Sequence, residues 1–140
     1  MDTQKKTQRE IKFRLRIGNR IVGFEKWYPG AGLAALPRWL YSKDGKYWNP
    51  DYIFHDSKDQ FTGLKDKNGK EIWEGDIVKS CVGELGEVIF LAWQAFSGFT
   101  VKSIPQEGYG PGFFQLTGIW DDIEVIGNIY KNPELIGANP

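Results

Sequence analysis

The sequence predicts a mainly β protein, a small barrel or sandwich with little helix. Short runs of alternating or continuous apolar residues recur about every 8–12 residues, which is typical of such folds. Glycine-containing turns separate these runs, and no stretch shows helical periodicity beyond about two turns. The chain has 140 residues, of which 41% are hydrophobic, so we expect one domain with a core of its own.

The N-terminal part predicts a flexible tail followed by a β-hairpin. Residues 1–8 are polar without periodicity, and we expect them to form a mobile tail. Residues 10–16 alternate strictly, which predicts a strand with one buried face and one basic face. A Gly-Asn turn at residues 18–19 then leads into a second predicted strand over residues 21–24.

The next segment predicts a loop, a second hairpin and a short strand. Residues 28–37 combine prolines, glycines and small apolar residues, so we expect an irregular loop with at most one helical turn. Residues 38–48 carry aromatic residues on both sides of an Asp-Gly turn at residues 44–45 and predict a hairpin. Residues 52–55 predict an edge strand.

The second half predicts further strands around well-marked turns. The Asn-Gly dipeptide at residues 68–69 and the Gly-Asp dipeptide at residues 75–76 predict tight bends. The apolar run over residues 87–93 predicts a strand that is buried on both faces. Residues 119–130 predict the last strand, and residues 132–135 a single helical turn after it.

The composition excludes several kinds of site. One cysteine cannot form an internal disulfide, and one cysteine with one histidine cannot supply the ligands of an ordinary zinc site. No run reaches the roughly 18 apolar residues of a membrane span, and the N-terminus lacks the apolar stretch of a secretion signal. We therefore expect a cytoplasmic protein with no membrane partner and no cofactor.

The zero net charge conceals an asymmetry between the two halves of the chain. Residues 1–50 carry a net charge of +7, whereas residues 51–140 carry −7. This split suits a basic surface for a polyanion, a self-complementary surface for oligomers, or two halves that pack on each other. The basic face of the first strand, with Arg14 and Arg16, is the best candidate for phosphate contacts. The alternative is an edge strand that is charged to prevent aggregation.

Aromatic residues are the second unusual feature. They make up 15% of the chain, and eight of them gather in residues 27–54 with Arg38, Lys43 and Lys46 between them. Aromatic rings interleaved with cations suit stacking on nucleic-acid bases. They also suit a small β domain that fills its core with few, large side chains, and this structural interpretation is favoured.

A group of carboxylates in residues 66–76 offers a possible metal or acid/base site. Its members are Asp66, Glu71, Glu74 and Asp76. The favoured interpretation is structural, because Asp66 and Asp76 stand at predicted turns where side-chain oxygens accept backbone N–H bonds. The single histidine, His55, could act as a general base but is interpreted as a structural residue. The single cysteine, Cys81, gives no argument for a reactive thiol.

Three segments are similar to one known family. The segments are REIKFR at residues 9–14, QFTGLKDKNGKEIWEGDIV at residues 60–78 and EVIGNIYKNPEL at residues 124–135. They resemble, in order and in spacing, the opening strand, the central signature and the closing segment of the YopX family. The resemblance covers about residues 9–135.

The resemblance implies a protein of bacteriophages and prophages, located in the cytoplasm of the bacterial host. It implies a single β domain over residues 9–137, with an SH3-like barrel over about residues 61–131 and an N-terminal β-hairpin layer. It implies no settled activity and no catalytic or metal-binding residue. The residues of the motif are interpreted as structural: Thr62, Gly63, Asp66, Asn68, Gly69, Glu74, Gly75, Asp76, Gly127 and Asn128.

Small barrels of this kind are mostly binding modules, so we expect a non-enzymatic protein that binds a protein partner or a second copy of itself. The alternative is a nucleic-acid-binding module, and a metal-dependent enzyme that uses the carboxylates of the central motif ranks third. The candidate ligand-binding or nucleic-acid-binding residues are Arg14, Arg16, Trp39, Tyr41, Lys43, Lys46, Tyr47 and Trp48.

Overall fold

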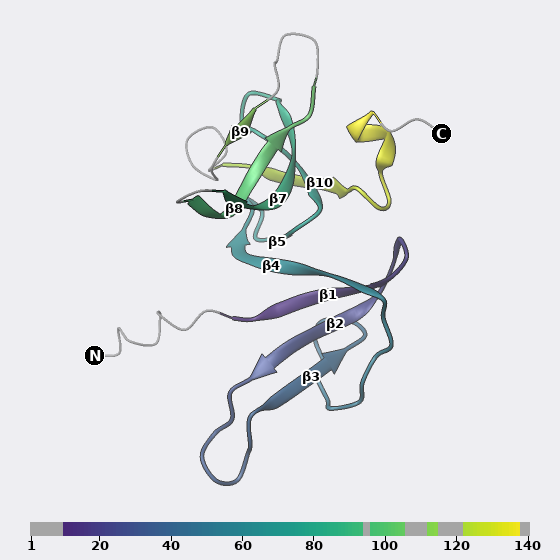
Figure 1. The fold of residues 1–140 in the computed structure, drawn as a ribbon, viewed down its shortest axis with the longest axis vertical. Coiled ribbons are helices and arrows are strands. Elements are labelled where there is room, and N and C mark those ends of the chain that lie inside the picture. Colours follow the sequence, from purple (N-terminus) through teal and green to yellow (C-terminus); the bar gives the residue numbers. More distant parts are fainter. Residues whose placement is uncertain (1–9, 94–95, 106–111, 115–121, 138–140) are drawn as a thin grey trace, which may run out of the picture. The chain divides into compact units, whose positions relative to one another are not determined.

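The computed structural model describes residues 10–93, 96–105, 112–114 and 122–137, and it is mainly β (Figure 1). The predicted fold class is therefore confirmed, whereas the predicted tail at residues 1–8 lies outside the described residues. The chain divides into two compact units, Met1–Gly63 and Leu64–Pro140.

The first unit is built on antiparallel strands. These are β1 (Lys12–Ile17), β2 (Arg20–Tyr28), β3 (Arg38–Ser42) and β4 (Ser57–Lys65), and β4 runs past the boundary between the units. The order in the sheet is β3-β2-β1-β4-β5, where β5 is Glu71–Trp73, so β1 lies between β2 and β4. Gly18, with a φ of 59°, turns β1 back into β2, as the Gly-Asn dipeptide predicts.

The two faces of this sheet differ in chemistry. Partners across the register lie on the same face, so Trp27 and Trp39 share one face, while Arg14 lies on the other. The prediction that β1 presents one basic face to solvent differs from the structure, because Lys12 and Arg14 are only 8% and 6% exposed. Leu15, which points to the opposite face, is fully buried as predicted.

The described residues of the second unit form the remaining strands and a short helix. These are β5 (Glu71–Trp73), β6 (Asp76–Lys79), β7 (Leu85–Trp93), β8 (Phe96–Ser103), β9 (Phe113–Phe114), β10 (Glu124–Asn128) and the 3-10 helix η3 (Pro133–Ile136). The second sheet has the order β10-β6-β7-β8-β9, and its pairs are antiparallel. The predicted helical turn after the last strand is η3. The SH3-like barrel stays a prediction.

The core of the second unit is a cluster of branched apolar side chains. Its members are Ile72, Val78, Val88, Val101, Ile123 and Val125. They come from five strands and from the residue before β10, and each is less than 9% exposed. Burial of β-branched residues on a pleated surface is what stabilises such a sheet.

Two strand predictions are wrong in part. Residues 52–55 form no strand, since they run as an irregular segment beside the first sheet. β7 is not buried throughout, because Phe90 is 47% exposed on the same face as the fully buried Val88, and Ile89 on the other face is only half-buried. An apolar run by itself does not tell a doubly buried strand from one with a solvent-facing side.

In the described part of the chain, no helix has the length and hydropathy needed to cross a membrane.

Candidate functional site

The turn that follows β3 is organised by the side chain of Asp44. Its Oδ1 accepts hydrogen bonds from the backbone N–H groups of Lys46, at 2.8 Å, and Tyr47, at 3.0 Å, and from the hydroxyl of Ser42, at 3.0 Å. The N–H group of Tyr47, followed by that of Lys46, lowers the pKa of Asp44. An aspartate that accepts N–H bonds from the next two or three residues defines a turn. The turn therefore holds one conformation and presents Tyr47 to solvent.

The chain then returns past the end of β3. Tyr41 and Asn49 exchange backbone hydrogen bonds of 2.7 and 3.0 Å, and the side chain of Asn49 accepts the N–H of Asp51 at 2.8 Å. Ile53 packs onto Gly23 so closely that a Cβ there would lie 2.7 Å from its Cδ1. The hairpin predicted over residues 38–48 is thus present as its first strand and its turn, with one residue pair instead of a second strand.

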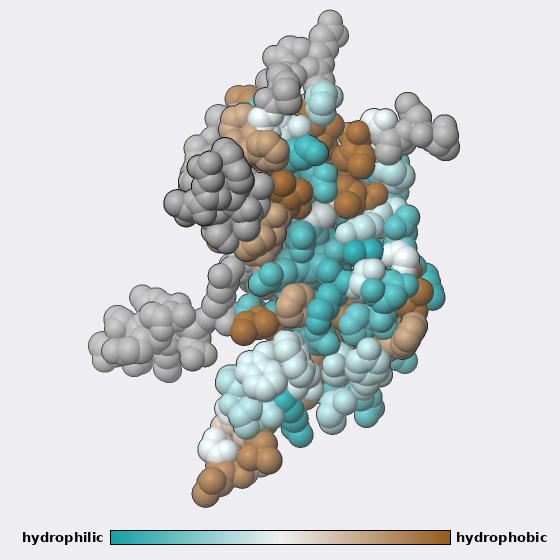
Figure 2. Space-filling view, in the orientation of Figure 1, coloured by the Kyte–Doolittle hydropathy of each residue, from teal (hydrophilic) through white to brown (hydrophobic). Residues whose placement is uncertain are grey.

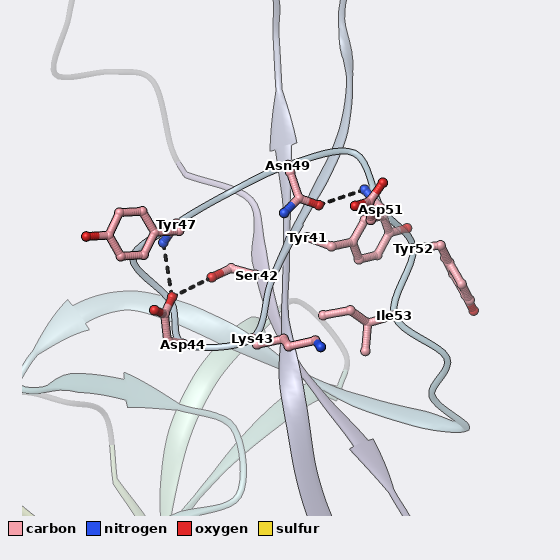
Figure 3. A pocket seen from close by; sticks show the side chains of 9 residues that line it. All are labelled: Tyr41, Ser42, Lys43, Asp44, Tyr47, Asn49, Asp51, Tyr52 and Ile53. Atoms are coloured by element: carbon pink, nitrogen blue, oxygen red, sulfur yellow. Dashed lines mark hydrogen bonds between the residues drawn. The ribbon is translucent and has the colours of Figure 1, made fainter.

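A pocket of about 490 Å³ lies between the turn and the returning segment (Figure 3). Its lining residues are Tyr41, Ser42, Lys43, Asp44, Tyr47, Asn49, Asp51, Tyr52 and Ile53. Figure 3 shows Tyr47 at one end and Tyr41 with Tyr52 at the other. Tyr47 is 79% exposed and Tyr52 is 62% exposed, so both rings are accessible to a ligand. We call this site the tyrosine pocket.

One wall of the tyrosine pocket is formed by the buried Tyr41 and the rings that pack on it. Burial raises the pKa of Tyr41 to about 12, and a hydrogen bond to the carboxylate of Glu25 adds to the rise. The ring of Tyr41 meets that of Tyr52 edge to face, with centroids 5.2 Å apart. Tyr52 in turn lies 5.6 Å from the ring of His55, whose Nδ1 is 2.8 Å from the carbonyl oxygen of Ile53. The wall is therefore a chain of mutually supporting rings.

Glu25 links the pocket to an aromatic cluster on the same face of the sheet. The Nζ of Lys58 donates a hydrogen bond of 2.9 Å to Glu25 and lies 4.5 Å from the ring centroid of Phe13. Lys58 also lies 5.8 Å from the ring of Trp39, which meets Trp27 at 5.2 Å. This lysine is thus engaged by a carboxylate and by aromatic faces at once.

The arginines of the predicted basic face are engaged within the protein. Nε of Arg14 donates to Asp59 at 3.2 Å, and Nε and Nη2 of Arg16 donate to the same carboxylate at 3.0 to 3.3 Å. The side chains of Arg14, Arg16 and Asp59 are 7%, 13% and 3% exposed. The structure therefore places both arginines in a buried ion-pair network and not on an open basic surface.

The other predicted ligand-binding residues do not share one surface. Trp39 and Tyr41 lie on the face with Glu25, whereas Trp48 packs against Lys26, whose Nζ is 4.5 Å from its ring and belongs to the opposite face. Lys43, Lys46 and Tyr47 are exposed on the turn. Of the eight predicted residues, the structure brings three together at the tyrosine pocket, namely Tyr41, Lys43 and Tyr47.

The first carboxylate of the central motif is used within the second unit. Oδ1 of Asp66 accepts the N–H groups of Asn68 and Lys70, at 2.8 and 2.9 Å, while Oδ2 accepts the N–H of Val125 at 2.9 Å. Burial opposes ionisation of Asp66, but these three N–H groups together outweigh it and lower the pKa of the carboxyl. Gly69 closes the turn with a φ of 82°. Asp66 therefore joins the turn to β10.

The bend between β5 and β6 is built in the same way. Oδ2 of the buried Asp76 accepts the N–H of Trp73 at 2.8 Å. Gly75 adopts a φ of 91°, donates its N–H to Val88 and accepts the N–H of Ile129. Glu74 lies between them and is half-buried. The motif residues before them, the buried Thr62 and Gly63 with a φ of 87°, lie in β4.

The closing segment is fixed by two asparagines. Oδ1 of Asn128 accepts the N–H groups of Tyr130 and Lys131, at 3.0 and 2.9 Å, and Oδ1 of Asn132 accepts the N–H of Asn128 at 3.2 Å. Gly127 lies directly against Asn132, and a Cβ at this position would overlap its side-chain oxygen. Asn128 and Gly127 therefore shape the exit from β10.

The described ranges contain no group of three or more His, Cys, Asp or Glu side chains that could coordinate a metal ion. The carboxylate oxygens of Asp66 and Asp76 accept hydrogen bonds from backbone N–H groups. Cys81 is exposed in the turn between β6 and β7. The central motif thus acts as a framework for the fold.

Sequence reasoning missed several residues of the site. The pocket is also lined by Asn49, Asp51 and Ile53. Glu25 supports it through a hydrogen bond to Tyr41. No sequence motif marks any of these residues. One indication was available, because the Asp-Gly turn at residues 44–45 brings the residues on either side of it together. The contacts of Glu25 with Lys58 and of Asp59 with Arg14 join residues 33 and 45 positions apart and leave no local trace.

Comparison with known proteins identifies a family. The family model described as YopX protein matches residues 39–137, which include the tyrosine pocket, the 60–78 signature and the closing segment. The similarity noted at residues 9–14 lies outside this match. A search of the curated proteins finds no match. Since the matched residues cover more than half of the sequence, the chain belongs to the YopX family.

Proposed function

We propose that this protein is a non-enzymatic binding module that engages a segment of another protein at the tyrosine pocket. The observation that carries the proposal is the pocket itself, in which Tyr47 and Tyr52 expose most of their surface beside a volume of about 490 Å³. Exposed tyrosines supply large contact areas with few rotatable bonds, and for that reason they are enriched at the centres of protein interfaces.

The polar groups of the pocket favour a peptide over a strongly charged ligand. Lys43 contributes one positive charge, and Asp44 and Asp51 contribute two negative charges, so no single sign dominates the rim. Ser42 and Asn49 add hydroxyl and amide groups that adapt to backbone donors and acceptors. An extended segment with one or two apolar side chains fits this combination of rings and polar groups.

The setting of the proposed activity follows from the family. The resemblance implies a phage or prophage protein, so the partner is a phage or bacterial protein in the host cytoplasm, or a second copy of this chain. A metal-dependent reaction is the weakest alternative, because the carboxylates that it requires hold backbone N–H groups of the fold.

Selection of peptides from a random display library on the immobilised protein tests the proposal. We expect selected peptides to bind the wild type with micromolar affinity by titration calorimetry. The variant Tyr47→Ala/Tyr52→Ala should weaken this binding at least about tenfold, because buried tyrosines commonly carry about 2 kcal/mol or more at interfaces. Measurement of the mass of the wild-type protein in solution over a range of concentrations tests whether the partner is a second copy of this chain.

The matched control for this experiment is Phe113→Ala, which removes an aromatic side chain of similar exposure, 57%, from the second unit. It should leave the affinity unchanged. Peptides that bind equally well to the wild type and to the tyrosine variant would place the binding elsewhere and overturn the proposal.

Nucleic acid is the second candidate, and one observation favours it. Lys43 and Lys46 are exposed on the same turn as Tyr47, an arrangement in which cations contact phosphates while a ring stacks on a base. Titration of oligonucleotides at low and high salt, followed by tryptophan fluorescence, tests this function. Micromolar binding that weakens with salt and is lost in Lys43→Glu/Lys46→Glu would support it, and a flat titration at low salt would exclude it.

A further inference from the structure

The loop between β2 and β3 exposes apolar side chains at the end of a hairpin. Its residues 29–37, PGAGLAALP, include no polar side chain. Leu33 is 100% exposed and Leu36 is 67% exposed. Figure 1 shows this loop reaching beyond the ends of β2 and β3, and Figure 2 shows hydrophobic residues gathered at its end. We call residues 29–37 the apolar loop.

The conformation of the apolar loop is fixed by its own backbone. The N–H of Ala31 donates to the carbonyl of Ala35 at 2.8 Å, which closes the loop on itself. Gly30 has a φ of 92°, and a Cβ there would lie 2.7 Å from the same carbonyl oxygen. The hydrogen-bonded loop therefore fixes the backbone around Leu33, and its side chain is exposed in a defined conformation.

Aromatic residues and the basic residue Arg38 lie at the base of the apolar loop. Tyr28 pairs with Arg38 and Trp27 with Trp39 in the last two rungs of the hairpin. Trp39 is 39% exposed, and Arg38 is exposed beside it. The unit that carries the loop, Met1–Gly63, has twelve basic and seven acidic side chains, a net charge of +5.

This arrangement suits a lipid surface better than a protein groove. Protein interfaces combine apolar centres with about one hydrogen bond per 100–200 Å², and the apolar loop has no side chain to make one. A bilayer interface requires no polar partner, accepts tyrosine and tryptophan at the level of its headgroups, and attracts cations when its lipids are anionic. The zero net charge of the whole chain conceals this feature, because it averages over both units.

We propose that the apolar loop inserts into the surface of an anionic membrane, which departs from the expectation, based on the sequence, of no membrane partner. Leu33 and Leu36 enter the boundary between headgroups and acyl chains, Tyr28 and Trp39 lie at the headgroups, and Arg38 contacts lipid phosphates. The contact is peripheral and reversible, because a single short loop buries little apolar area. It is separate from the tyrosine pocket, which lies in the turn after β3.

Cosedimentation with vesicles of phosphatidylcholine and anionic phosphatidylglycerol tests the proposal. We expect the wild-type protein to partition onto these vesicles and to partition less as salt rises. The variant Leu33→Ser/Leu36→Ser should lower the partition coefficient about tenfold or more, since it removes both inserted side chains. Arg38→Gln should lower it several-fold, about the effect of removing one charge near the surface.

Two controls separate insertion from general adhesion. Val82→Ser removes an exposed apolar side chain, 54% exposed, from the second unit and should leave partition unchanged. Tyr47→Ala/Tyr52→Ala should also leave it unchanged, which distinguishes the membrane contact from the proposed pocket. The double serine variant and the Arg38 variant should melt at the wild-type temperature, because the substituted side chains are exposed.

Three outcomes would overturn the proposal. A wild-type protein that stays in the supernatant would leave the loop as a contact for another protein. Equal partition of the wild type and the serine variant would place membrane binding on another surface. Equal partition onto vesicles of phosphatidylcholine alone would exclude the role of anionic lipid.

Discussion

The two units of the molecule bury carboxylates by different means. In the first unit, Asp59 is held by Arg14 and Arg16, and Glu25 by Lys58 and by the hydroxyl of Tyr41. In the second unit, Asp66 and Asp76 are held by backbone N–H groups, and Glu84 by the hydroxyl of Ser103 at 2.7 Å. The first unit therefore uses ionic side chains where the second uses neutral donors.

The difference has a consequence for function. In the second unit the polar side chains of the family signature serve the turns, so these residues shape the fold. In the first unit, aromatic rings and a pocket lie at the surface, and the pocket residue Tyr41 is hydrogen-bonded to Glu25, which forms an ion pair with Lys58. We infer that the second unit acts as the framework and that the first unit carries the binding surfaces.

The largest effect is expected from Asp59→Ala, which removes the carboxylate but leaves two buried cations. Loss of one partner from a buried ion pair costs about 3–5 kcal/mol, so we expect unfolding in urea at a markedly lower concentration. Asp51→Ala removes the same charge from an exposed position and should change stability by less than about 0.5 kcal/mol. Equal stability of the Asp59 variant and the wild type would show that the ion pairs contribute nothing to the first unit.

A slightly smaller effect is expected from Asp66→Asn, which turns an amide NH₂ toward backbone N–H donors. The unsatisfied donors should cost about 3 kcal/mol at neutral pH. Because the folded-state pKa of Asp66 is lowered, its contribution is present above the unfolded-state pKa of about 3.9 and is lost as pH falls through the folded value. Urea unfolding at pH 7 and below pH 4 should therefore show a smaller acid-induced loss in the variant. An identical loss in both proteins would contradict this role of Asp66.

The closing segment should respond to Gly127→Ala through a direct clash. The new Cβ would overlap Oδ1 of Asn132, and relief of that overlap would disturb its hydrogen bond to the N–H of Asn128. We expect a loss of about 2 kcal/mol in thermal unfolding. The control is Gly69→Ala, where a Cβ meets open space and only a φ of 82° is strained, at a cost of about 1 kcal/mol. A larger loss at Gly69 would reverse the expected order.

The smallest effect at neutral pH is expected from Tyr41→Phe, which removes one hydrogen bond to Glu25 and about 1 kcal/mol. The folded-state pKa of Tyr41, about 12, lies above the ordinary value of 10.0, so wild-type stability should fall as pH rises between these values. The variant should lack that part of the alkaline loss, whereas Tyr52→Phe should retain it. Absorbance titration of the phenols checks the assignment, and a wild-type protein without a late phenol transition would refute it.

Much of the fold follows from local patterns. The Gly-Asn, Asp-Gly, Asn-Gly and Gly-Asp dipeptides mark turns that the structure contains, because positive φ and side-chain acceptors act within a few residues. The alternation at residues 10–16 gives the strand β1 and its buried Leu15. The same alternation mispredicts the environment of Arg14, since the sequence does not reveal which layer covers the second face of a strand.

The candidate site was predicted in part. The aromatic segment 27–54 contains the tyrosine pocket, but its rings divide between the core, two faces of the sheet and the exposed turn. Trp39 and Trp48 are similar in sequence context, yet they meet different lysines, Lys58 and Lys26. Exposure decides whether a ring stabilises the core or binds a ligand, and exposure depends on strand register.

The sequence by itself determined the mainly β class and the turns, including the local bonds of Asp66 and Asp76, because these features arise from interactions between near neighbours. The bond between the N–H of Val125 and Asp66 spans 59 residues and depends on the tertiary structure. The tertiary structure decided the rest. Only the pairing of β1 with β4 brings Asp59 to Arg14 and Arg16, across 45 and 43 residues, and converts a predicted basic surface into a buried network. Only the packing of the segment after residue 48 onto β2 and β3 opens the tyrosine pocket. Contacts between residues far apart in the chain depend on the register of whole strands, which no local pattern specifies.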